Sequence, residues 1–211
     1  MKNKLAIFGG AFDPIHIGHI KPVQEIIEKH DIDVVHFVPT NITSTDKKII
    51  ASSKERIKMI ELSLSNIPKL IIDDREITRG GVSYTIDTLR SISDDHPGSK
   101  LYLIVGYDVM NTLHLWKDID DIFSLCNIIV LDRDQPKGPA SKDSLNQLIS
   151  KRISKDLGMF HDQSYGKIYI DRAKMINISS SKIKMSIKNN KSVAGMVCPE
   201  LESWLQKNKV Y

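Results

Sequence analysis

Residues 4–20, KLAIFGGAFDPIHIGHI, set the architecture that the rest of the chain repeats. The apolar run at residues 4–8 precedes Gly9 and Gly10, which predicts a buried strand that ends in a turn. From Gly18 onward, apolar residues recur at three- and four-residue steps, which predicts a helix that ends near Lys29. A strand, a glycine turn and a helix in this order predict the start of a strand–helix–strand unit.

The same alternation continues along the chain. Further strands are predicted at residues 33–38, 70–72, 101–105, 128–131 and 167–170, and further helices are predicted to begin near residues 52, 83, 179 and 198. Residues 132–141 are predicted to form a surface loop, followed by a polar helical insert to about residue 156. Strands that alternate with helices predict a Rossmann-like α/β fold, in which a doubly wound parallel sheet carries helices on both faces.

Composition limits the kind of protein. The 211 residues, 41% of them hydrophobic, suffice for a single domain over residues 1–211, with a helical C-terminal part at about residues 172–211. The net charge of +4 is modest for a nucleic-acid binder, so we expect no nucleic-acid partner. No apolar stretch approaches the roughly 20 residues that a membrane span needs, so no membrane partner is expected. Cys126 and Cys198 lie far apart, which favours a reduced cytoplasmic setting. Whether the chain forms a homo-oligomer stays open.

The residues after the first predicted strand favour a phosphate site. Gly9 and Gly10 let a ligand approach the backbone, and the N-terminus of the next helix offers amides and a partial positive charge. His16 and His19 lie three residues apart, so both imidazoles face one side, and Gly18 keeps the surface between them low. Imidazoles donate hydrogen bonds to phosphoryl oxygens. A metal site and purely structural histidines are the alternatives, but both leave the glycine pair unexplained.

Residues 9–19, GGAFDPIHIGH, resemble the opening signature of the nucleotidylyltransferase superfamily. A second element of that superfamily is a serine-rich helix start that ends in a basic residue, and residues 178–184, ISSSKIK, match it. Serine hydroxyls and helix amides provide a second anion site, and lysines supply cations for a triphosphate. The resemblance implies catalytic roles for His16, His19 and Lys184. It implies ATP or phosphate binding by Gly9, Gly10, Phe12, Gly18, Gly106, Asp108, Arg133, Ile178, Ser179, Ser180 and Ser181.

Three segments between these motifs resemble the bacterial nicotinate-nucleotide adenylyltransferases. Residues 83–85, SYT, match a helix start whose amides receive a pyridine carboxylate in that family. Residues 106–108, GYD, match a Gly-x-Asp segment whose acid can accept sugar hydroxyls, and Trp116 matches a tryptophan that stacks on the pyridine ring. The resemblance implies nicotinate mononucleotide binding by Asn41, Lys47, Tyr84, Thr85 and Trp116.

The chain departs from the pattern of this family at two places. The family carries a Pro-Pro-His-basic stretch after its second strand, whereas residues 39–47 here are PTNITSTDK and lack the later prolines and the histidine. The residue that closes the serine motif is usually arginine. Lys184 keeps the charge of that arginine without its bidentate fork.

The function that the resemblance implies is adenylyl transfer from ATP to nicotinate mononucleotide, with release of pyrophosphate, in NAD biosynthesis. Mg²⁺ is expected to accompany ATP, and no metal ligand is assigned to the protein's side chains. The alternatives are a phosphopantetheine adenylyltransferase, a class I aminoacyl-tRNA synthetase-like core and a nucleotide-binding module without catalysis. The first would leave residues 83–85 and Trp116 without a pyridine to bind, and the second needs room for a tRNA-reading domain.

Overall fold

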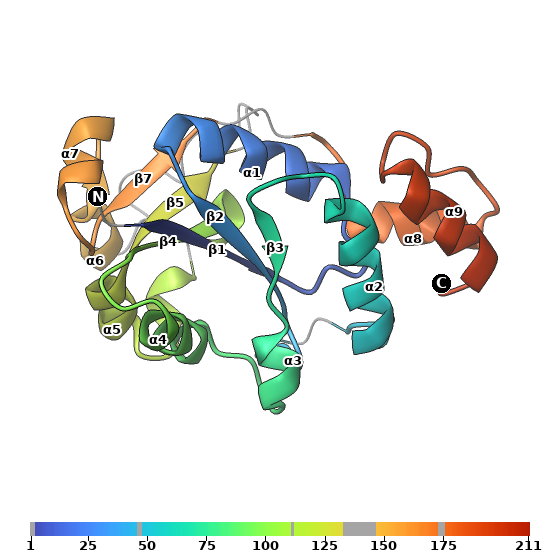
Figure 1. The fold of residues 1–211 in the computed structure, drawn as a ribbon, viewed down its shortest axis with the longest axis horizontal. Helices are drawn as coiled ribbons and strands as arrows, with labels where there is room; N and C mark the ends of the chain where they lie inside the picture. Colours follow the sequence, from blue (N-terminus) through green and yellow to red (C-terminus); the bar gives the residue numbers. More distant parts are fainter. Residues whose placement is uncertain (1–2, 46–47, 111, 133–146, 173–175) are drawn as a thin grey trace.

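The computed structural model describes residues 3–45, 48–110, 112–132, 147–172 and 176–211. Within these residues, parallel strands form a seven-stranded sheet in the order β3-β2-β1-β4-β5-β7-β6 (Figure 1). The strands are β1 Lys4–Gly10, β2 Val34–Pro39, β3 Leu70–Ile72, β4 Lys100–Gly106, β5 Cys126–Leu131, β6 Ile153–Ser154 and β7 Ile168–Asp171. The helices are α1 Ile17–His30, α2 Ser53–Leu64, α3 Arg75–Arg79, α4 Thr85–Asp95, η1 Tyr107–Val109, η2 Leu113–Leu115, α5 Ile119–Leu125, α6 Gln147–Ser150, α7 Leu157–Asp162, α8 Ser180–Lys188 and α9 Pro199–Asn208.

The doubly wound parallel sheet predicted from the sequence is confirmed, with small changes in element bounds. β1 runs through Gly10 instead of ending at residue 8, because Gly9 and Gly10 pair with Val38 and Pro39 of β2. The glycines are therefore the last two residues of the strand, and the turn begins after them. α2 begins close to residue 52 as predicted, with a capping box in which the Ser52 amide donates to the Glu55 carboxylate at 2.7 Å.

Some short helices were not predicted from the sequence. α3 and α5 contain five and seven residues, too few for a helical periodicity to stand out. The prediction of a helical insert up to about residue 156 is wrong in part, since that stretch holds the two-residue edge strand β6 after α6. Residues 133–146, which include most of the predicted loop, lie outside the described residues.

The hydrophobic core lies on both faces of the sheet. Side chains alternate along β1, so that Ala6 and Phe8 face one helix layer, while Leu5 and Ile7 face the other. Helices α1, α2, α8 and α9 contribute to the first layer, and α4, α5 and α6 contribute to the second. Figure 1 shows α1 and α4 on opposite sides of the sheet, and α8 and α9 together beside α2. This layering brings the C-terminal helices close to the N-terminal end of α1.

The strand order reverses between β1 and β4. The chain passes from β1 outward to β2 and β3, then returns to place β4 on the other side of β1. In open parallel sheets of this kind, ligands bind outside the carboxyl ends of the strands at this reversal. The fold therefore directs attention to the residues after β1 and β4.

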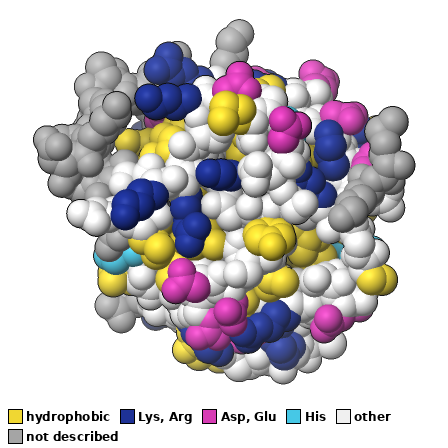
Figure 2. Space-filling model, turned by 90° about the vertical axis from the view of Figure 1, so that its left-hand side faces the viewer, with side chains coloured by type: hydrophobic (Ala, Val, Ile, Leu, Met, Phe, Trp, Pro, Cys, Tyr) yellow, Lys and Arg dark blue, Asp and Glu magenta, His cyan; other side chains and the backbone are white. Residues whose placement is uncertain are grey.

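The molecular surface mixes both signs of charge. On the face drawn in Figure 2, lysine and arginine side chains alternate with acidic ones, and hydrophobic side chains occur in small areas. Among the described helices, none combines the length and apolar composition that crossing a membrane would require.

His161, a partly buried residue of α7 next to the buried His30, makes stability depend on pH. The His161 ring accepts from or donates to the Tyr102 hydroxyl at 2.9 Å. Burial, then the neighbouring charges of His30, Lys4 and Lys100, lower the pKa of His161 from 6.5 to about 4. Below pH 6.5 the unfolded chain therefore binds a proton at His161, whereas the folded protein binds it only near pH 4. The free energy of unfolding consequently falls as the pH is lowered from 6.5 to about 4.

We expect His161→Gln to reduce this loss of unfolding free energy at low pH by about 1 kcal/mol. The effect is this small because solvent screens a ring that is only partly covered. Urea unfolding at pH 4.5, 5.5 and 6.5 measures the free energy of unfolding of the wild type and of His161→Gln. An unchanged slope in the variant would contradict the assignment of this titration to His161.

Candidate active site

The turn after β1 is held in an unusual conformation. Phe12 has a φ of +46°, a left-handed angle that non-glycine residues rarely adopt. Its ring is buried and packs edge-on against the His19 ring, with 5.4 Å between the centroids. Phe12 was predicted to bind ATP or phosphate. Its buried side chain packs against His19, so only its backbone could contact a ligand.

The two histidines predicted to be catalytic lie together at the start of α1. The His16 and His19 rings are stacked, with centroids 3.6 Å apart and planes 17° from parallel. The backbone amide of His16 donates to Nδ1 of His19 at 3.2 Å, so the neutral His19 ring carries its proton on Nε2. His16 is buried and His19 is partly exposed. A methyl group on Gly18 would lie 3.1 Å from the His16 ring and 3.2 Å from a backbone oxygen, so glycine allows this close packing.

Asp13 joins the turn to the C-terminal helices. Its carboxylate is buried and accepts a hydrogen bond from the Lys184 ammonium at 2.7 Å. The amides of Ile50 and Ala51 donate to the same carboxylate, both at 3.0 Å, and the Tyr211 hydroxyl donates at 2.9 Å. Burial would raise the pKa of Asp13, but these donors outweigh it and hold the pKa below its ordinary value. Asp13 is therefore an ionised carboxylate that fixes Lys184, the third predicted catalytic residue.

The serine-rich motif meets the same turn. The Ser180 hydroxyl donates to the backbone oxygen of Pro14 at 2.9 Å, across 166 residues of sequence. Ser179 caps α8 by accepting from the amide of Lys182 at 3.2 Å, while Ser181 is exposed in the first turn of the helix. Ile178 precedes this cap and is partly buried. The two predicted phosphate-binding segments thus converge in space.

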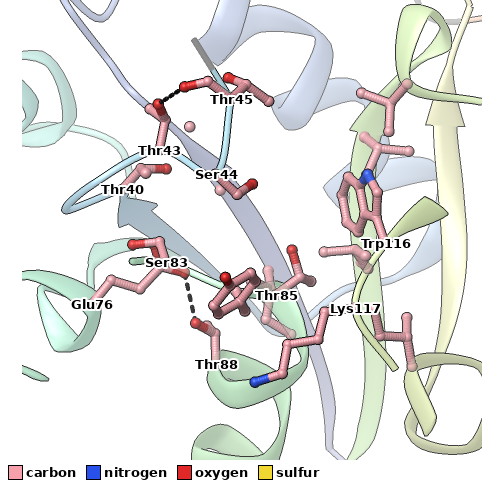
Figure 3. A pocket seen from close by; sticks show the side chains of 18 of the residues that line it. Thr40, Thr43, Ser44, Thr45, Glu76, Ser83, Thr85, Thr88, Trp116 and Lys117 are labelled. Carbon is pink, nitrogen blue, oxygen red and sulfur yellow. Dashed lines mark hydrogen bonds between the residues drawn. The ribbon is translucent and has the colours of Figure 1, made fainter. Parts of the chain in front are cut away.

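A cavity of about 1090 Å³ opens at the carboxyl ends of β1 and β4, and Ala11 of the turn after β1 lines it. Gly9 and Gly10 form part of its wall, as predicted for a ligand that approaches the backbone. Figure 3 shows Thr43 and Ser44 on one side of the cavity and Trp116 on the other, with Thr85 at the start of α4 between them.

The residues predicted to bind the mononucleotide divide into three groups. Tyr84, Thr85 and Trp116 line the cavity. Asn41 does not: its side-chain amide donates to the Gly81 carbonyl at 2.9 Å, and so holds the loop after β2 against the loop before α4. Lys47 lies outside the described residues, as does Arg133 of the predicted ATP site.

The Gly-x-Asp segment follows β4 as predicted. Asp108 is exposed in the short helix η1, and its carboxylate folds back over Gly106. A methyl group on Gly106 would lie 2.6 Å from the Asp108 carboxylate, so the glycine leaves room for it. Neither residue lines the cavity, so their part in ATP binding stays a prediction.

The cavity also holds residues that the sequence did not single out. Thr43, Ser44 and Thr45 line it with hydroxyls, although the loop lacks the family's histidine. Lys117 lines it as well and places its ammonium 4.6 Å from the centroid of the Tyr84 ring. A cluster of small polar residues directly after a buried strand was the one signal available for the threonines.

A buried carboxylate supports the start of α4. Glu76 of α3 accepts a hydrogen bond from the Thr88 hydroxyl at 2.6 Å (Figure 3). Burial raises the pKa of Glu76, and hydrogen bonds from Thr88 and Ser83 oppose that rise. Glu76 therefore ties α3 to the segment that presents Tyr84 and Thr85 to the cavity.

The described side chains do not form a cluster of ligands for a metal ion. Within the described residues, no three histidine, cysteine, aspartate or glutamate side chains cluster as metal ligands. Both oxygens of Asp13, the acid in the turn after β1, already accept hydrogen bonds.

The class of the protein follows from this fold and from comparison with known families. Residues 7–186 match the cytidylyltransferase-like family, so the chain is a nucleotidyltransferase of that class. Relatives named probable nicotinate-nucleotide adenylyltransferase occur in Pseudoalteromonas atlantica, at 30% identity over 100% of this chain and 96% of the relative, and in Legionella pneumophila strain Corby, at 32% over 99% of each. The chain belongs to the nicotinate-nucleotide adenylyltransferase family.

Solved structures agree with the fold. The nicotinic acid mononucleotide adenylyltransferase of Plasmodium falciparum, complexed with NaAD, has a TM-score of 0.70 at 18% identity, over 97% of this chain and 95% of that one. A putative nicotinate-nucleotide adenylyltransferase from Vibrio parahaemolyticus has a TM-score of 0.67 at 15% identity, over 100% of this chain and 96% of that one. At these identities the likeness establishes the fold alone.

Proposed function

We propose that this protein transfers the adenylyl group of ATP to nicotinate mononucleotide, forming nicotinate adenine dinucleotide and pyrophosphate. One observation carries the proposal beyond family membership. The glycine–histidine turn and the serine-rich helix start are joined by hydrogen bonds, at 2.9 Å between Ser180 and Pro14 and at 2.7 Å between Lys184 and Asp13, beside a cavity that Trp116 lines.

The two segments would hold ATP between two helix N-termini. The amides at the starts of α1 and α8 and the partial positive charge of each helix attract phosphate oxygens. Nε2 of His19 donates a hydrogen bond to the α-phosphate of ATP, which is the group transferred. Lys184 offsets the negative charge that grows as pyrophosphate departs. Ser180 and Ser181 add hydroxyl and amide donors for the outer phosphates.

The mononucleotide would occupy the cavity. Trp116 offers a flat face for the pyridine ring, and the amides at the start of α4 offer donors for its carboxylate. Hydroxyls of residues 43–45 reach the same space from the loop after β2. Asp108, in η1 directly after β4, would accept hydrogen bonds from sugar hydroxyls of ATP.

The chemistry needs alignment and charge stabilisation from the protein, without a covalent intermediate. An oxygen of the mononucleotide phosphate forms a bond to the α-phosphorus of ATP, and the bond from that phosphorus to the bridging oxygen of pyrophosphate breaks. Holding both phosphates in line turns a bimolecular step into an effectively unimolecular one. Mg²⁺ would accompany the triphosphate, where it would neutralise charge on the leaving group.

Pyrophosphate release tests the function. The purified protein is given MgATP with nicotinate mononucleotide, nicotinamide mononucleotide or phosphopantetheine in parallel reactions. We expect release with nicotinate mononucleotide and no release with phosphopantetheine. Release with phosphopantetheine alone would overturn the proposal in favour of the sister activity, and release with none of the three would overturn adenylyl transfer to this group of acceptors.

A further inference from the structure

Tyr211 lies at the phosphate-binding turn although it follows the last helix of the chain. Its hydroxyl donates to Oδ1 of Asp13 at 2.9 Å, across 198 residues of sequence. Its ring lies 5.7 Å from the Lys184 ammonium, and its hydroxyl also approaches the sulfur of Met59 at 3.7 Å. Tyr211 therefore contacts both members of the ion pair that joins the two phosphate-binding segments.

The two oxygens of Asp13 divide their donors in a regular way. Oδ1 accepts from Tyr211 and from the amide of Ala51, and Oδ2 accepts from Lys184 and from the amide of Ile50. Each oxygen thus has one backbone donor and one side-chain donor. The carboxylate cannot rotate without losing several of these bonds, so its orientation fixes the direction in which Lys184 is held.

The hydroxyl of Tyr211 is suited to a permanent donor role. Burial and the adjacent Asp13 carboxylate raise the pKa of Tyr211 above its ordinary value, so the hydroxyl keeps its proton at every working pH. Lysine needs such support more than arginine would, because a single ammonium on a flexible stem has no planar fork to fix its direction. A family position usually filled by arginine is filled here by Lys184.

We propose that Tyr211 is a positioning residue for adenylyl transfer, which acts through Asp13 to hold the Lys184 ammonium toward the ATP phosphates. This inference rests on the proposed function of the site. Tyr211 itself touches neither substrate, so its removal should affect the use of ATP and leave the use of the mononucleotide unchanged.

Tyr211→Phe tests the inference, because it removes the hydroxyl and keeps the ring beside Lys184 and Met59. We expect KM for ATP to rise about fivefold, with KM for nicotinate mononucleotide within about twofold of the original. The melting temperature should fall by only a few degrees, about 2–5 °C, because one hydrogen bond to a buried carboxylate is lost. Tyr165→Phe is the matched control, since Tyr165 is exposed and belongs to a different part of the fold.

A double-mutant cycle separates positioning from a purely structural role. If Tyr211 acts through Lys184, the fivefold effect of Tyr211→Phe should largely disappear in a Lys184→Met background. The same fivefold loss in that background, an unchanged KM for ATP in Tyr211→Phe, or an equal rise in KM for both substrates would each overturn the inference. Wild-type protein without activity toward ATP and nicotinate mononucleotide would instead overturn the proposed function.

Discussion

His19→Ala should lower turnover about a hundredfold or more while the protein stays folded. The reason is the geometry at the start of α1. The amide of His16 fixes Nδ1 of His19 as an acceptor, so Nε2 can act as the donor that the proposed reaction needs at the transferring phosphate. Steady-state pyrophosphate release gives the turnover, and circular dichroism checks the fold.

His19→Gln is the matched control for this prediction. A glutamine amide can place an N–H donor close to the position of Nε2, so turnover should exceed that of His19→Ala by about tenfold. Wild-type turnover in His19→Ala would remove His19 from the mechanism. Equal losses in both variants would show that something other than hydrogen-bond donation is required of the ring.

Trp116→Ala should raise KM for nicotinate mononucleotide about tenfold or more and leave KM for ATP nearly unchanged, since the stacking of a flat ring on an aromatic side chain contributes that much to binding. Trp116 lines the cavity opposite the loop at residues 43–45 (Figure 3), and the cavity lining does not include His16, His19 or Lys184. The same steady-state assay, with one substrate varied at a time, supplies both constants.

Trp116→Phe separates stacking from bulk. Phenylalanine keeps a smaller flat face, so its KM for nicotinate mononucleotide should lie between those of the wild type and Trp116→Ala. A parallel rise in KM for ATP in Trp116→Ala would mean that the change disturbs the whole site. No rise in either constant would place the pyridine somewhere other than against Trp116.

The architecture was predictable where local sequence carries the physical cause. The strand residues 5–8 and 101–105 are buried on both faces of the sheet, so each set appears as an unbroken apolar run. The helix starts at Ser52 and Ser179 carry their own capping hydroxyls. α3, with its five residues, has no such signal, because its position depends on Glu76 bonding to a residue of α4.

The candidate site was predictable as a set of motifs and less so as a set of contacts. Residues 9–19 and 178–184 could be paired because each resembles a motif of the same superfamily. Asp13 and Tyr211 could not be paired, since their hydrogen bond spans almost the full length of the chain and leaves no local pattern. Asn41 matched the family pattern loosely, but its amide bonds to Gly81, which only the tertiary fold reveals.

The convergence of both segments on a single ATP is tested most directly by hydrogen–deuterium exchange with a non-hydrolysable ATP analogue. Titration with α,β-methylene ATP and Mg²⁺ should slow amide exchange in peptides that cover residues 9–19 and 178–184, with the same half-saturating concentration for both. Protection of one segment without the other, or protection at two clearly different concentrations, would contradict the account.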